Sequence, residues 1–246
     1  MRSLPASALL CAWLGAVREG HAGPDDLEDA VRGHDPRHLV VGLRASLPAG
    51  GAVATMHPDQ DLMELRELPR VLPEPPRLAL PAPGDLLGLG GPPALNFAAL
   101  EAGEAVVCGP VALVPELDAR TVVWRAHDAG PVTYVDERET ALELRSTLTE
   151  VTRQLVDLDV ASWQPEIPDL LMNLRQRPRL PLPPGLDPRR IETVDRAVLC
   201  LEIVGLALAD EGGAVSAYEV SRRREVLRDL DRAARRALVG ACSGAR

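Results

Sequence analysis

Hydrophobic residues near the start of the chain recur at helical spacing. Leu10, Trp13, Leu14 and Val17 step by three and four, which predicts an N-terminal amphipathic helix. The same run also resembles a short secretory signal, but Pro5 and Trp13 interrupt its apolar core. We therefore expect a helix of the mature protein rather than a targeting segment.

Three more elements are expected before a proline-rich stretch. Pro24 suits the first turn of a helix over 25–32, and 38–43 reads as a strand. A helical turn or two is expected within 56–68. The prolines of 69–76 force an extended connection, so we predict an internal boundary there.

The middle of the chain carries short apolar runs separated by Gly and Pro, a pattern typical of strands in antiparallel hairpins. In the last run, Val122 and Trp124 alternate with Val123, Arg125 and His127, which predicts a sheet with one covered face. The stretch 84–102 fits either a loop or a short helix. The expected strands are Arg77–Leu80, Ala105–Cys108, Val111–Val114 and Arg120–His127.

The last hundred or so residues predict helices with clear start and stop signals. Asp136 with Glu139 forms a capping box before a long apolar stripe, and a further box is expected at Ser216 and Glu219. The segment 197–209 has one charge among thirteen residues, so we expect a buried central helix that pairs antiparallel with the last one. The helices are expected over 136–158, 165–174, 187–210 and 216–241.

These elements define the expected fold class. We predict an α+β protein in which a small antiparallel sheet in the middle of the chain packs against a C-terminal helical bundle, with N-terminal helices completing the outer layer. The expected regions are 1–68, 77–133 and 136–246, which could share one compact domain.

Composition narrows the class of function. The chain carries 36 acidic residues against 27 basic ones, all of them Arg, for a net charge of −9. Without Lys, neither a Schiff base nor a P-loop ammonium is available. With 2% aromatic residues there is little to stack on bases. Four Cys without a C-x-x-C pair favour a reducing, cytoplasmic compartment.

The turn 84–96 is the first candidate site. Its glycines would let backbone amides approach a ligand, and Pro92-Pro93 can open a helix whose N-terminus attracts anions. A tight connection between elements is the simpler interpretation. A small anionic ligand there would involve Gly88, Gly90, Gly91, Asn96 and Arg125.

Two titratable residues are weak catalytic candidates. Glu202 is the lone charge in the apolar helix; if buried, its pKa would rise and it could act as an acid or base, but an ion pair with an Arg is the simpler interpretation. His127 beside Asp128 could be a general base, although no nucleophile signature accompanies it. Cys108 is more typical of a core residue than of a nucleophile.

Metal and nucleic-acid sites are weakly supported. His34 and His38 have metal-ligand spacing, but Pro36 breaks the helix that would align them, and we expect no metal and no cofactor. The last helix carries seven Arg, yet acidic residues interleave with them at three and four positions, as on a solvated helix. We expect no nucleic-acid binding and no membrane span.

Several phrases resemble a known family. The run 81–85, the Gly88–Pro93 turn with Asn96–Ala105, and Cys200–Val204 are similar to an uncharacterised family of high-GC bacteria. The resemblance covers most of the chain and implies no activity. The expected function is therefore a noncatalytic protein-interaction or regulatory role, with a protein partner or self-association. The alternative is an enzyme or sensor that binds a small anion at the turn 84–96.

Overall fold

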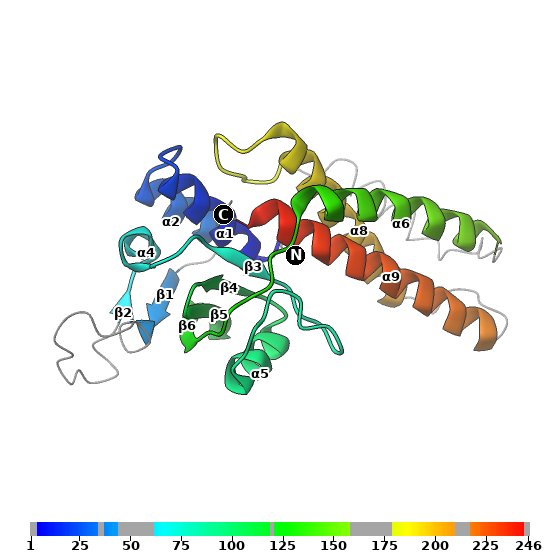
Figure 1. The fold of residues 1–246 in the computed structure, drawn as a ribbon, viewed down its shortest axis with the longest axis horizontal. Helices are drawn as coiled ribbons and strands as arrows, with labels where there is room; N and C mark the ends of the chain where they lie inside the picture. Colours follow the sequence, from blue (N-terminus) through cyan, green and yellow to red (C-terminus); the bar gives the residue numbers. More distant parts are fainter. Residues whose placement is uncertain are drawn as a thin grey trace. The chain divides into compact units, whose positions relative to one another are not determined.

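A computed structural model shows two compact units (Figure 1). The sheet unit comprises 2–135, 181–187 and 242–246; the helical unit comprises residue 1, 136–180 and 188–241. The structure describes residues 4–33, 37–43, 62–118, 121–157, 179–209 and 217–243.

The expected regions 1–68 and 77–133 both belong to the sheet unit. The proline-rich stretch 69–76 is thus no boundary between units, and the main chain instead passes from one unit to the other at Asp136. Pro69 lies in the first turn of the helix α4 (Leu68–Val71), and the later prolines separate this helix from the strand β3 (Arg77–Ala79) inside a single unit.

The sheet unit contains six strands and the N-terminal helices. The strands are β1 (Arg37–Val41), β2 (Leu62–Met63), β3 (Arg77–Ala79), β4 (Ala105–Cys108), β5 (Val111–Asp118) and β6 (Thr121–Asp128). The helices are α1 (Ala6–Arg18), α2 (Pro24–Arg32), the 3-10 turn η2 (Leu65–Glu67), α4 (Leu68–Val71) and α5 (Pro93–Ala102).

The sheet has the order β2-β1-β6-β5-β4-β3. Strands β3 to β6 form the expected antiparallel meander, and β2 runs antiparallel to β1, but β1 pairs parallel to β6. The sheet is therefore mixed. The parallel pair joins strands far apart in sequence, where no hairpin fixes direction. The helical turn expected within 56–68 is present as η2, while residues 62–63 form the strand β2.

One face of the sheet is covered by α1. This helix packs on β3, β4 and β5, and its Leu10 and Leu14 are at most 1% exposed. His38, Val40 and Trp124 continue the same buried layer across β1 and β6. The predicted N-terminal helix is confirmed, and it is buried on nearly every side rather than along one stripe alone.

The opposite face is covered by α5 over only part of its width. Leu95 and Ala99 of α5 pack in one cluster with small residues of β3, β4 and β5. These sheet residues are Ala79, Ala105, Val107, Ala112 and Val114. The ambiguous stretch 84–102 thus contains both a turn and a helix.

Two segments from late in the chain are hydrogen-bonded to the N-terminal part of the sheet unit. The Ser243 hydroxyl accepts a hydrogen bond from the Leu78 amide at 3.1 Å, on the edge strand β3. The Trp13 indole donates to the Pro181 carbonyl at 2.8 Å. These contacts explain why short stretches from late in the chain belong to this unit.

The helical unit contains α6 (Glu137–Asp157), α8 (Pro188–Ala209) and α9 (Ala217–Cys242). The carboxylate of Asp136 accepts a hydrogen bond from the Glu139 amide at 2.9 Å, which confirms the predicted cap of α6. Arg190, near the start of α8, donates to the Ala241 carbonyl at 2.8 Å. This contact confirms that α8 and α9 are antiparallel.

The apolar segment of α8 is buried on one side only. Ala197, Val198, Cys200 and Val204 are buried, whereas Leu208 remains 40% exposed. We expected this segment to be interior throughout, but only two other helices of its unit are described beside it. No described helix is long and apolar enough to cross a membrane. The expected helix 165–174 and the cap at Ser216 lie outside the described residues.

Candidate interaction surface

Arg125 and Glu116 form the main charged pair on the α5 side of the sheet. The Arg125 guanidinium donates two hydrogen bonds to the Glu116 carboxylate, each at 2.9 Å, across the β5–β6 pairing. These bonds lower the pKa of Glu116 and raise that of Arg125. Because about half of each side chain is exposed, the pair adds little stability. It does neutralise the surface around it.

His127 lies on the same face, two residues along β6 from Arg125. It is directly opposite buried Ala112, and its Nε2 is buried without a hydrogen-bond partner among the described residues. Burial lowers the pKa of His127, the Arg125 charge lowers it further, and Glu116 and Asp128 oppose the shift. The imidazole is therefore neutral at physiological pH. No described nucleophile is bonded to it, so a base role stays a prediction.

Beyond α5, side chains on this face of the sheet are partly exposed, and no helix among the described residues is seen to bury them. The register places Val41 and Leu62 in one row with Arg125, and Leu39 in the next row with Val123. Leu39, Val41 and Val123 are partly exposed, and Leu62 is 56% exposed. We call Leu39, Val41, Leu62 and Val123 the open half of the sheet.

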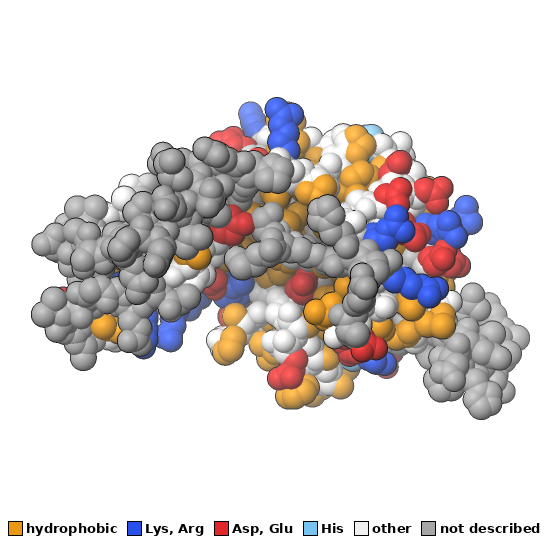
Figure 2. Space-filling view, turned by 180° about the vertical axis from the view of Figure 1, so that it is seen from behind, with side chains coloured by type: hydrophobic (Ala, Val, Ile, Leu, Met, Phe, Trp, Pro, Cys, Tyr) orange, Lys and Arg blue, Asp and Glu red, His pale blue; other side chains and the backbone are white. Residues whose placement is uncertain are grey.

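The outer side of α5 is also apolar. Phe97, the only Phe in the chain, is 69% exposed. Pro93 and Ala94 are exposed beside it, and Leu100 is partly exposed. Hydrophobic side chains reach the surface both over α5 and near the β1–β2 edge (Figure 2). The open half and the outer side of α5 together form the candidate interaction surface.

The glycine-rich turn packs against its own chain. A Cβ on Gly88 would lie 2.7 Å from the Leu78 carbonyl oxygen, and one on Gly90 would collide with the Pro131 carbonyl. The Gly91 amide donates to the Asn96 side chain at 3.2 Å, while the Gly91 carbonyl accepts from Gly130 at 2.8 Å. The space that these glycines leave open is thus occupied by the protein's own backbone. Ligand binding at Gly88, Gly90, Gly91 and Asn96 stays a prediction.

Glu202 lies on α8 in the helical unit and is partly exposed. The structure does not bury this side chain in the interior, and its role as an acid or base stays a prediction. The helix turns this side chain away from the buried positions Cys200 and Val204. No relation between Glu202 and the residues of the sheet unit follows from the structure.

The histidines do not form a metal site in the described part of the chain. His38 is buried and accepts a hydrogen bond from the Trp124 indole at 3.1 Å. His34 and His57 fall outside the described residues. No three His, Cys, Asp or Glu side chains gather as metal ligands within the ranges given above.

The four cysteines are buried, and none of them is in a disulfide. Burial raises the pKa of Cys108 to about 12, with a small opposing effect of Arg18 and a small reinforcing one of Glu74. This thiol therefore stays protonated and inert at physiological pH. The placement agrees with the interpretation of Cys108 as a core residue.

Four arginines of α9 are held by acidic neighbours or by α6. Arg222 pairs with Glu225 at 2.7 Å and Arg235 with Asp231 at 2.8 Å. Arg232 lies 3.4 Å from Asp229, and Arg236 reaches Glu143 of α6 at 3.2 Å. These pairs use much of the positive charge that could attract a nucleic acid.

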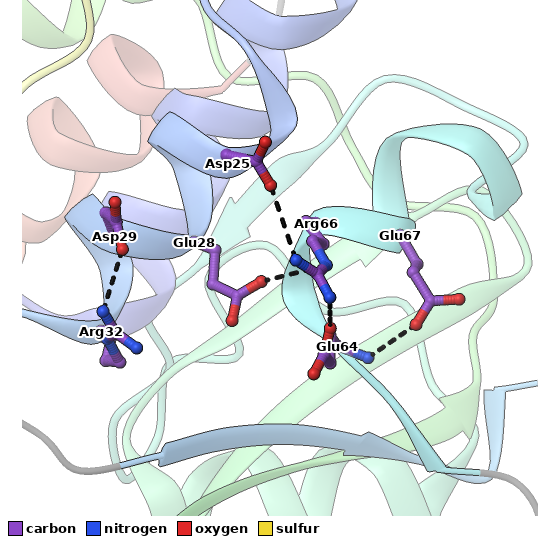
Figure 3. Close-up of polar contacts among 7 residues, drawn as sticks. All are labelled: Asp25, Glu28, Asp29, Arg32, Glu64, Arg66 and Glu67. Carbon is purple, nitrogen blue, oxygen red and sulfur yellow. Dashed lines mark hydrogen bonds and ion pairs between the residues drawn. The ribbon is translucent and has the colours of Figure 1, made fainter.

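A second charged cluster lies between α2 and η2 (Figure 3). Arg66 contacts Glu64 and lies 3.8 Å from the carboxylates of Asp25 and Glu28. The charge of Glu64 raises the pKa of Arg66, and the charges of Glu28 and Asp25 raise it further. The cluster ties the start of α2 to η2 by solvent-exposed pairs, a structural role.

A groove of about 400 Å³ runs between α6 and α9. Its lining includes Glu150, Gln154, Val226 and Asp229. The Gln154 amide donates to Glu150 at 2.6 Å, and its carbonyl oxygen accepts from Arg222 at 3.1 Å. Its polar side chains are thus bonded to one another, so the groove offers few free groups to a ligand.

The sequence identified part of the candidate surface. The alternation of Val123, Arg125 and His127 indicated their common face, which the structure confirms. The sequence did not identify Phe97 or β1 as part of the candidate interaction surface. The lone Phe in a chain poor in aromatics was a usable signal, whereas the position of β1 beside β6 depends on a long-range pairing.

Two family models together match almost the whole chain. Residues 7–138 match the model described as the Rv1486c-like protein, N-terminal domain, and residues 138–239 match that of the C-terminal domain. The junction at residue 138 lies two residues from the boundary between the two units. Neither a curated protein nor a solved structure matches the chain.

Proposed function

The chain belongs to the Rv1486c-like family, and we propose that it is a noncatalytic cytoplasmic protein that binds a protein partner in an interaction or regulatory role. The observation that supports this proposal is the candidate interaction surface of the sheet unit. This surface comprises the exposed Phe97 of α5 and the partly exposed apolar side chains of the open half of the sheet. Exposed apolar surface carries a solvation cost that a binding partner removes.

The composition of this surface resembles that of protein interfaces. An exposed aromatic residue, Phe97, belongs to it, and the charges of Arg125 and Glu116 neutralise each other. Interface cores are enriched in aromatic residues and depleted of unpaired charge. A partner with an apolar, near-neutral face would therefore fit it.

The cytoplasmic part of the proposal is supported by the thiols. None of the four cysteines is in a disulfide, and Cys108 and Cys200 are both buried with raised pKa values. Buried thiols outside disulfides suit a reducing compartment.

Capture from native lysate tests the proposal. The tagged chain is compared with Phe97→Asp and with Leu117→Asp, a control at a 78% exposed leucine on the opposite face of β5. We expect a protein at stoichiometric levels on the unaltered chain and on the control, and its loss from Phe97→Asp. A captured partner can be another protein or a second, untagged copy of the chain. Equal capture by all three chains, or no stoichiometric partner of either kind on the unaltered chain, would overturn the proposal.

A small anionic ligand at the turn 84–96 is the second candidate. It is supported by α5, whose first backbone N–H donors, at Ala94 and Leu95, have no acceptor within the helix, beside the partly buried Asn96. A thermal-shift screen of nucleotides and phosphorylated metabolites should raise the melting temperature, and Asn96→Ala should reduce that rise. An unchanged melting temperature across the screen would exclude this candidate.

A further inference from the structure

The sheet is wider than the helix that covers it. Neighbouring strands lie roughly 4.8 Å apart and a helix with its side chains is about 10 Å across. Of the six strands, α5 packs in its cluster with β3, β4 and β5, and it also contacts β6. On the same face, Leu39 and Val41 of β1 are partly exposed and Leu62 of β2 is exposed, so β1 and β2 offer room for one more helix beside α5.

The outer side of α5 has the features of the helix that would fill this space. Phe97 projects from it, with Pro93, Ala94 and Leu100 around the ring. Only Glu101 brings a charge to this side, and it makes no ion pair with a residue that the structure describes. The helix thus has two apolar sides, of which its own sheet covers one.

The open half carries the opposite charge at its margin. Arg37 begins β1, shares the face of Leu39 and Val41, and is exposed. Within the described ranges it has no acidic partner. Arg125 is already satisfied by Glu116. The helix therefore offers one unpaired carboxylate and the open half one unpaired guanidinium.

We infer that the partner on this surface is a second copy of the chain, bound about a two-fold axis so that each α5 lies on the open half of the other sheet. The inference rests on the proposed function and specifies its partner. The two α5 helices would form one layer between two sheets, with Phe97 of each copy on Leu39, Val41 and Val123 of the other. Such an interface is self-complementary, as a two-fold requires.

Charge supports a second copy over an unrelated protein. Two chains of net charge −9 repel one another in general, but the contact surface pairs a carboxylate with a guanidinium twice. Glu101 of one copy would meet Arg37 of the other, and the symmetry repeats the pair. One chain thus carries Phe97, the open half that would receive it, and the charges of Glu101 and Arg37.

Sedimentation velocity of the purified full chain over a concentration series tests this inference. We expect a species of twice the 26.4 kDa chain mass. Phe97→Asp should weaken the dimer at least tenfold, whereas Leu117→Asp on the opposite face should not change it. Each variant alters an exposed side chain, so we expect both to fold. Circular dichroism checks that they do.

Charge reversal makes the test specific. Glu101→Arg and Arg37→Glu should each weaken association, and the double variant should recover at least tenfold in dissociation constant over either single variant. A chain that remains monomeric, a dimer that Phe97→Asp leaves unchanged, or a double variant no better than the singles would overturn the inference.

The two proposals fail separately. A monomeric chain that captures another protein through Phe97 would overturn the second copy as partner while the interaction role stands. A monomeric chain whose capture is unaffected by Phe97→Asp would overturn both.

Discussion

The indole Nε1 of Trp124 donates a hydrogen bond to Nδ1 of His38 at 3.1 Å, between two buried side chains on adjacent parallel strands. Trp124 is fully buried, so its N–H has no access to water and needs this acceptor. The pair also fixes the register of β1 against β6, because a shift by one residue would turn the His38 side chain to the other face of the sheet.

Replacing His38 by Ala should therefore lower the free energy of unfolding by about 2–3 kcal/mol, from the unsatisfied indole and the cavity together. Urea unfolding followed by circular dichroism measures it. His127→Ala, on the partly exposed face, is the matched control and should cost less than about 1 kcal/mol. Equal losses would contradict the buried role of His38.

The packing of Gly90 predicts a loss of stability that does not depend on any ligand. A side chain there meets the Pro131 carbonyl, so Gly90→Val should reduce stability by about 3 kcal/mol. Gly15→Ala is the control with the opposite sign, because nothing lies within 4 Å of its added Cβ in α1. It should stabilise by up to about 1 kcal/mol. Differential scanning calorimetry compares the two; no destabilisation of Gly90→Val would refute the close approach.

Burial of His127 predicts a pH dependence. Its folded pKa lies below the ordinary value of 6.5, so the unfolded chain binds the proton more readily. The contribution of His127 to the free energy of unfolding is complete above the pKa of the unfolded chain and declines as the pH falls toward the pKa of the folded chain. Because the ring is partly exposed, the change should stay below about 1 kcal/mol. NMR titration should give a midpoint below 6.5, and His127→Gln should flatten the stability profile there. A midpoint at or above 6.5 would contradict it.

Arg190 joins the ends of two helices in the helical unit. It donates to the last turn of α9 at Ala241 and lies 3.6 Å from Glu137 of α6. Arg190→Ala should cost about 1–2 kcal/mol, because a partly buried carbonyl loses a charged donor. Arg196→Ala, which removes only an exposed pair with Glu192, should cost less than about 0.5 kcal/mol. Chemical denaturation ranks the two; the reverse order would contradict this role.

Buried thiols predict resistance to alkylation. With the pKa of Cys108 near 12 and all four cysteines buried, iodoacetamide at pH 8 should leave the native chain unmodified and label all four sites in urea. Intact-mass spectrometry distinguishes these outcomes. Rapid labelling of Cys108 in the native chain would show that β4 opens locally.

The sequence determined the local structure over most of the described chain. The cap at Asp136, the first-turn prolines of α2 and α8 and the alternation of β6 depend on neighbours within a few residues, and each appears as predicted. The same reasoning identified Cys108 as a core residue. It also set Arg125 and His127 on one face, since strand geometry alternates side chains without reference to the rest of the fold.

Tertiary structure decided what those residues face. The parallel pairing of β1 with β6 joins residues more than eighty positions apart, and neither hydrophobic period nor turn chemistry encodes such a contact. That pairing places His38 in the core, and it adds Leu39 and Val41 to the surface beside α5. Likewise, only the approach of Pro131 shows why Gly90 must be glycine. Local patterns fix which side of an element is apolar, but the other elements decide whether that side is covered.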